Sequence, residues 1–134
     1  MTRSRRELLA KFNCNPPAAE AAIQRIQAAL HFSLPADYVD FLRRANGGEG
    51  FIGNAYVILY PAEELTEANE GYGFAKYAPG LFLFGSDGGG EGFAFDMRSK
   101  AGPVVSVPFI GMELAVARPV DSDFSAFLEE LFDS

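Results

Sequence analysis

Apolar residues recur at helical spacing in three segments of the chain. The first begins with the Asn-Pro-Pro sequence at 15–17, which is typical of a helix start, and continues to residue 30. The second runs from residue 34 to a terminating glycine at 47. The third follows an acidic cap at 121–123 and carries the apolar stripe Phe124, Phe127, Leu128 and Leu131. These patterns predict three amphipathic helices.

Segments rich in β-branched and aromatic residues lie between the second and third helices. Strands are predicted at 55–60 and 103–107, a further strand at 113–118, and a hairpin over 81–96. Residues 61–65 have the pattern of a short helical turn, and 66–79 that of a partly helical loop. This order predicts an α+β domain in which helices pack on an antiparallel sheet meander.

The hairpin is the most informative predicted element. Glycines at 88–90 allow a tight reversal between its two apolar runs. That reversal brings Asp87 and Glu91 close together at one end of the sheet. Spacing by two within each run places four aromatic side chains on one sheet face, where we expect them to form core: Phe82, Phe84, Phe93 and Phe95.

Composition supports a single folded unit. Of 134 residues 49% are hydrophobic, and 13 are Phe, which is enough large apolar volume for one core. We therefore expect one domain over residues 1–134, with residues 1–14 as an N-terminal segment that can be mobile. Cys14 is the only cysteine, which excludes an internal disulfide and suits a reducing compartment. With no secretory signal and no membrane-length apolar stretch, the sequence indicates a soluble, cytoplasmic protein that does not bind membranes.

The formal charge is −7, from 18 acidic and 11 basic side chains. Four of the bases fall in the first eleven residues, so the body is more acidic still. Such a surface repels nucleic acid and speeds encounter with a basic protein, although it also serves plain solubility. We expect a protein partner and no nucleic acid.

Candidate catalytic groups are few. His31 is the single histidine, and it lies among apolar residues at a helix end. Ser86 lacks the glycine two residues upstream that a nucleophile elbow needs, and the glycine loop has no lysine to bind phosphate. Asp87, Glu91 and Asp96 lack the spacing of a calcium loop, and no apolar pocket is evident that would tune a carboxylate pair. The sequence predicts no catalytic residue, no metal ligand and no cofactor.

Glu49 lies in the glycine-rich run at 46–50, which would end the second helix and let the chain enter the sheet. The backbone conformation of this run does not require a charged residue at position 49. It either caps amides of the glycine turn or is an exposed recognition charge, and both interpretations remain open.

Several motifs together resemble the SUKH superfamily, the group that includes the Smi1/Knr4 proteins. The resemblance runs from residue 34 to the C-terminus, and it rests on Leu34-Pro35 with Asp37-Tyr38, Phe41-Leu42, Asn46-Gly47-Gly48-Glu49-Gly50, the hairpin and the closing helix. It implies the SUKH fold and a binding function, not an enzyme. Its known members are mainly immunity proteins encoded beside bacterial toxins, many of them nucleases, and eukaryotic regulators.

The leading hypothesis from this resemblance is an immunity protein that binds and neutralises a cognate toxin domain. Five acidic residues are the candidate partner contacts: Glu49, Glu63, Glu64, Asp87 and Glu91. The alternative is an intracellular regulatory interaction module without a toxin. A third hypothesis is a small-molecule site lined by Tyr56, Tyr72 or Tyr77. A homodimer through a sheet edge or aromatic patch is also compatible with the sequence.

Overall fold

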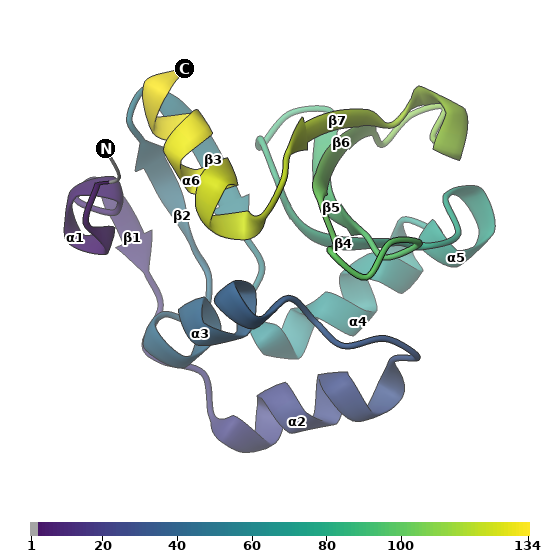
Figure 1. Ribbon diagram of the computed structural model, residues 1–134, viewed down its shortest axis with the longest axis horizontal. Coiled ribbons are helices and arrows are strands. Elements are labelled where there is room, and N and C mark those ends of the chain that lie inside the picture. Colours follow the sequence, from purple (N-terminus) through teal and green to yellow (C-terminus); the bar gives the residue numbers. More distant parts are fainter. Residues whose placement is uncertain (1–2) are drawn as a thin grey trace.

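The computed structural model describes residues 3–134 as a seven-stranded antiparallel sheet in sequence order, packed with helices (Figure 1). The strands are β1 (Phe12–Cys14), β2 (Gly48–Ile52), β3 (Ala55–Leu59), β4 (Leu81–Ser86), β5 (Glu91–Asp96), β6 (Val104–Pro108) and β7 (Arg118–Asp121). The helices are α1 (Arg5–Leu8), α2 (Glu20–Ala29), α3 (Ala36–Arg44), α4 (Ala62–Gly71), α5 (Phe74–Tyr77) and α6 (Phe124–Asp133), with a 3₁₀ turn η1 (Leu114–Val116). The predicted α+β class with an antiparallel meander is confirmed.

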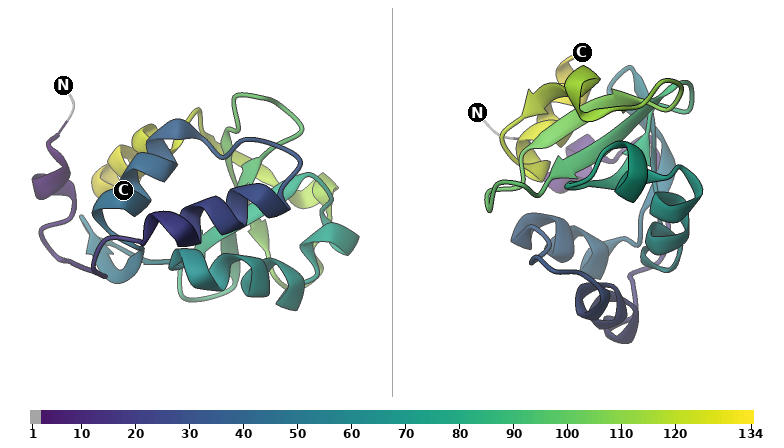
Figure 2. Two further views of the ribbon diagram at one scale, coloured as in Figure 1. Left: turned by 90° about the horizontal axis from the view of Figure 1, so that it is seen from below. Right: turned by 90° about the vertical axis from the view of Figure 1, so that its right-hand side faces the viewer.

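The larger core lies between one face of the sheet and the helices α3 and α6. All four hairpin phenylalanines belong to it, as their spacing predicts. The rings of Phe84 and Phe95 stack with centroids 4.3 Å apart, and Phe127 of α6 meets Phe84 edge-on at 5.5 Å. Tyr38 of α3 completes the cluster, 5.0 Å from Phe95. Figure 2 shows α2 as the outermost helix, packed below α3 and α4 on the side away from the sheet.

A smaller core lies on the opposite face of β4–β6. Leu81, Leu83 and Ala94 of the hairpin face it, together with Val105 and Val107. The helix α5 contributes Phe74 to this core, and α4 contributes the partly buried Ala68, whereas Ala62 and Leu65 of α4 belong to the larger core. The central strands are therefore buried on both faces.

Tertiary contacts move two helix boundaries away from the predicted ones. The first predicted helix starts at Glu20 rather than at 15–17, because Asn15 bonds to the segment leading into β2. Its backbone N–H donates to Gly47 O at 3.0 Å, and its amide donates to Asn46 O at 3.0 Å. The helix α4 extends past the predicted turn at 61–65 to Gly71, and with α5 it accounts for the helical part expected within 66–79. Asn69 anchors it by bonding to both backbone groups of Leu83 in β4, at 2.8 and 3.0 Å.

All but one of the other predicted elements are reproduced with small shifts. The helices at 36–44 and 124–133 form as expected, and the Asp123 carboxylate caps the latter by accepting from Ala126 N at 2.7 Å. The predicted strand at 113–118 is wrong. That segment forms η1, and β7 begins only at Arg118, where the chain comes alongside β6.

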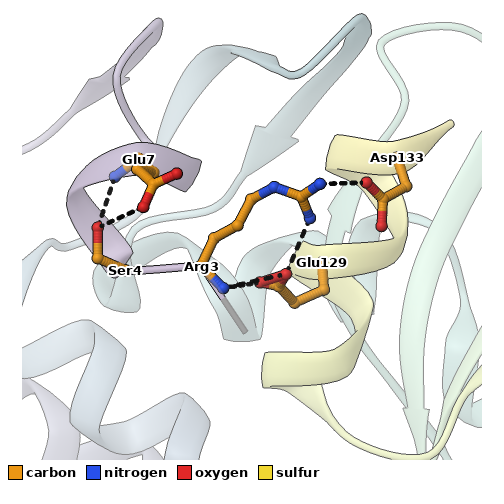
Figure 3. A network of polar contacts seen from close by, with 5 residues as sticks. All are labelled: Arg3, Ser4, Glu7, Glu129 and Asp133. Carbon is orange, nitrogen blue, oxygen red and sulfur yellow. Dashed lines mark hydrogen bonds and ion pairs between the residues drawn. The ribbon is translucent and has the colours of Figure 1, made fainter. Parts of the chain in front are cut away.

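Residues 3–14, part of the segment expected to be mobile, contain two elements that the patterns did not predict. The strand β1 pairs with β2, and Leu8 and Phe12 are buried in the larger core. Arg3 connects this segment to the end of α6 (Figure 3). Its guanidinium donates to Glu129 at 3.0 Å and to Asp133 at 2.6 Å, and it lies 4.4 Å from the centre of the Phe132 ring.

Arg3→Ala should loosen α1 and β1 without unfolding the domain, because the lost ion pairs are partly exposed. We expect faster amide hydrogen exchange across residues 5–14 and unchanged exchange in α3. A matched control is Arg43→Ala, which removes an exposed pair with Glu20 and should leave residues 5–14 unaffected. Equal protection of residues 5–14 in both variants would contradict the role of Arg3.

Tyr38→Phe should stabilise the protein. The side chain is 1% exposed, and its hydroxyl has no hydrogen-bond partner among residues 3–134. Removing a buried, unpaired hydroxyl while keeping the ring should raise the free energy of unfolding by about 1–2 kcal/mol. Urea denaturation measures the change. A lower free energy of unfolding would show that the hydroxyl is paired in solution.

Candidate protein-binding surface

The second face of the sheet is left uncovered at β2 and β3. Along these strands Ile52, Val57 and Leu59 point into the larger core. The alternate positions point outward, and there Phe51 and Tyr56 are 48% and 38% exposed. The two residues are direct cross-strand partners, and their rings meet edge-on with centroids 5.4 Å apart. Such large exposed rings favour contact with another molecule.

Glu49 lies on this same outward face of β2. Its carboxylate accepts a hydrogen bond from the Tyr56 hydroxyl, which raises the pKa of Tyr56. Among residues 3–134, the Glu49 side chain makes this one hydrogen bond. The geometry thus favours an exposed charge beside an aromatic ring over a cap of the glycine turn.

The β4–β5 loop extends this surface. Gly88, at φ +79°, lies so close to Tyr56 that a Cβ there would come within 3.2 Å of its ring. Asp87 shapes the loop, because its carboxylate accepts from Gly89 N at 2.8 Å and from Glu91 N at 3.2 Å. The exposed Asp87 charge is therefore fixed by the turn, next to the aromatic pair.

A second aromatic pair lies on the other side of the loop. Tyr72, at the end of α4, stacks on Phe109 with ring centroids 4.0 Å apart, and Phe109 N donates to Gly90 O at 2.9 Å. Nearby Tyr60 has a raised pKa, mainly because it is half-buried, with the charge of Glu64 adding to the effect. We define the aromatic–acidic surface as Phe51, Tyr56, Tyr72 and Phe109 with Glu49, Glu64 and Asp87.

The remaining two predicted contacts lie outside this surface. Glu63, in the first turn of α4, accepts from the Asn46 amide at 2.8 Å, which lowers the pKa of Glu63. The Glu91 backbone pairs with Asp87 as expected, but its carboxylate forms an ion pair with Arg118 of β7 at 3.3 Å. Both carboxylates have intramolecular partners.

The model of the SMI1 / KNR4 family (SUKH-1) matches residues 17–130. The chain belongs to this family. The match confirms the resemblance based on the sequence motifs. It begins after β1 and ends within α6, so α1 and β1 precede the matched range. A search of curated proteins found no match.

The groups that could support catalysis in this SMI1/KNR4-family chain are separated in the fold. Cys14 is an exposed residue of β1 whose thiol is partly desolvated, which raises the pKa of that thiol. His31 is exposed after α2. Among residues 3–134 no three His, Cys, Asp or Glu side chains gather as metal ligands, and no helix is long and apolar enough to cross a membrane. Cavities of about 680, 500 and 330 Å³ occur, but Tyr56, Tyr72 and Tyr77 line none of them.

Sequence reasoning missed Phe51 as a surface residue. Large aromatic residues in strands are usually buried, so residue type alone does not indicate that Phe51 is exposed. The alternation of Glu49 and Phe51 with Gly50 and Ile52 was an available signal for β2. It could not show which face would stay uncovered.

Asn46→Ala should destabilise the protein, because Asn46 joins the strand layer to α4. Its side-chain oxygen accepts from Ala62 N at 2.7 Å, and its amide donates to Glu63. Leaving these groups unpaired should lower the free energy of unfolding by about 1–2 kcal/mol. Asn54→Ala, at an exposed turn position, is the matched control and should change it by less than about 0.5 kcal/mol.

The hydrogen bond between Asn46 and Glu63 predicts that the free energy of unfolding depends on pH. The pKa of Glu63 is lowered on folding, so its contact stabilises above the ordinary glutamate pKa and is lost as the pH falls through the lowered value. The stability difference between wild type and Asn46→Ala should therefore shrink below pH 4 or so. A constant difference across this range would contradict the Asn46–Glu63 bond.

Proposed function

We propose that this chain is a non-enzymatic immunity protein, which neutralises a cognate bacterial toxin domain by binding it through the aromatic–acidic surface. The observation that carries the proposal is this surface itself. Exposed aromatic rings beside fixed carboxylates are typical of recognition patches, since Tyr and Phe are enriched at interface centres. Membership of the SMI1/KNR4 family is consistent with a binding role.

Charge favours a partner of basic character. The chain carries −7, and three exposed carboxylates lie by this surface: Glu49 bonds to Tyr56, Asp87 precedes the glycine that packs on the Tyr56 ring, and the charge of Glu64 acts on Tyr60. A toxin that acts on nucleic acid needs a basic cleft, and an acidic partner would both find that cleft rapidly and compete with its substrate. We place this interaction in the cytoplasm, where a protein with a single cysteine needs no disulfide.

Glu63 and Glu91 contribute less in this proposal, because Asn46 and Arg118 already engage them. A partner would have to displace those contacts before it could bind either carboxylate.

The test uses the C-terminal domain of the toxin-like protein that the adjacent gene would encode. Its binding to the purified chain is measured by calorimetry and by stopped-flow mixing at low and moderate salt. Wild type should bind tightly, with an affinity that falls as salt rises. No heat at either salt would contradict toxin neutralisation and favour the regulatory module instead.

Two variants test the surface. Glu49→Lys should slow association about tenfold at low salt, with a smaller effect at high salt, since it reverses a charge beside the rings. Phe51→Ala should weaken binding about tenfold or more, mainly through faster dissociation. Glu130→Lys reverses an exposed charge on α6, which packs on the opposite sheet face, and serves as the control. If all three variants bind with the association rate and affinity of wild type, the partner uses another surface.

A further inference from the structure

A cavity of about 680 Å³ opens between the α2–α3 connection and the turn that follows β5. It lies at the opposite end of the β4–β5 hairpin from the 87–90 loop, so it is separate from the aromatic–acidic surface. Its lining combines three apolar side chains with three that carry nitrogen donors: Leu30, Phe32 and Met97, with His31, Arg98 and Lys100.

The walls of this cavity are held in place by hydrogen bonds and packing. The Gln27 side chain donates to Phe32 O at 2.5 Å and accepts from Leu34 N at 2.8 Å, which fixes the connection after α2. The Phe32 ring packs edge-on against Phe82 of β4, with centroids 6.0 Å apart. On the other side, Met97 N donates to Gly80 O at 2.8 Å. The cavity is thus preformed, as ligand sites usually are.

The charge of the lining is opposite to that of the chain. No acidic residue lines the cavity, although acids outnumber bases 18 to 11 in the sequence. Asp96, which precedes Met97 in the chain, accepts hydrogen bonds from the Arg98 guanidinium at 2.8 and 2.9 Å, and this pairing lowers the pKa of Asp96. Lys100 forms no ion pair within residues 3–134. Its charge is available to a ligand.

We propose that this cavity binds a small phosphate monoester that carries an apolar group. The apolar part would contact Leu30, Phe32 and Met97. The phosphate would bind Lys100 and His31, with a remaining N–H of Arg98 as a further donor. A phosphate monoester suits this set better than a carboxylate, because it has more negative charge and three acceptor oxygens for donors on separate segments. The volume is in the usual range for such ligands, about 300–1,000 Å³.

The experiment is a titration of the full ¹⁵N-labelled chain with phenyl phosphate, followed by NMR. We expect saturable shifts at the amides of residues 30–33 and 97–100. Inorganic phosphate lacks the apolar part and phenol lacks the charge, so each should bind at least about tenfold more weakly. Lys100→Gln should weaken phenyl phosphate binding about fivefold, as expected for a partly exposed ionic contact. Lys11→Gln, at the far edge of the sheet beside β1, is the matched control and should bind as wild type.

Four outcomes would overturn the proposal. These are no saturable shift, shifts outside the two segments, equal affinity for inorganic phosphate, and equal affinity of Lys100→Gln and Lys11→Gln. Lys100 is exposed, so its replacement leaves the fold intact. A second variant, Ser33→Phe, places a ring at the cavity wall and should abolish the shifts at 97–100.

Discussion

Burial of the β4–β5 hairpin on both of its faces is the constraint on which the rest of the structure depends. One face carries the four phenylalanines and must be covered by α3 and α6, whose own aromatic residues Tyr38, Phe124 and Phe127 pack among them. The other face carries Leu81, Leu83 and Ala94 and packs against Phe74 of α5 and Ala68 of α4. A sheet with apolar side chains on both sides needs helices on both sides, so the hairpin dictates the layers.

The helical cover ends before the sheet does, and this mismatch creates the proposed binding surface. Strands β2 and β3 are covered on one face only, so their outward residues remain in solvent although they include Phe51 and Tyr56. In the proposed function, stability and recognition are divided between the two faces of the same strands. Ile52 and Val57 hold β2 and β3 on the core, whereas Phe51 is exposed, so its truncation creates no cavity.

The acidic residues serve different purposes that residue type does not distinguish. The Asp87 carboxylate accepts a backbone hydrogen bond that stabilises the hairpin loop. Glu63, in the first turn of α4, accepts from the Asn46 amide, and Glu91 forms an ion pair with Arg118 of β7. Glu49 is different, because it accepts its hydrogen bond from the hydroxyl of Tyr56, a residue whose ring is itself exposed. A carboxylate held beside an exposed ring is preorganised for a partner, since less side-chain freedom is lost on binding.

Local sequence by itself determined the helices α3 and α6, the β4–β5 hairpin and the membership of its phenylalanines in the core. Their periodicity, caps and turn glycines act within a few residues, so the pattern is sufficient. Only the tertiary structure decided the rest. The three-residue strand β1 exists because β2 offers it an edge, and α4 reaches Gly71 because Asn69 bonds to β4. Contacts between segments distant in the chain decide which sheet face stays open and which carboxylates have no intramolecular partner among the described residues. Periodicity carries no information about those contacts.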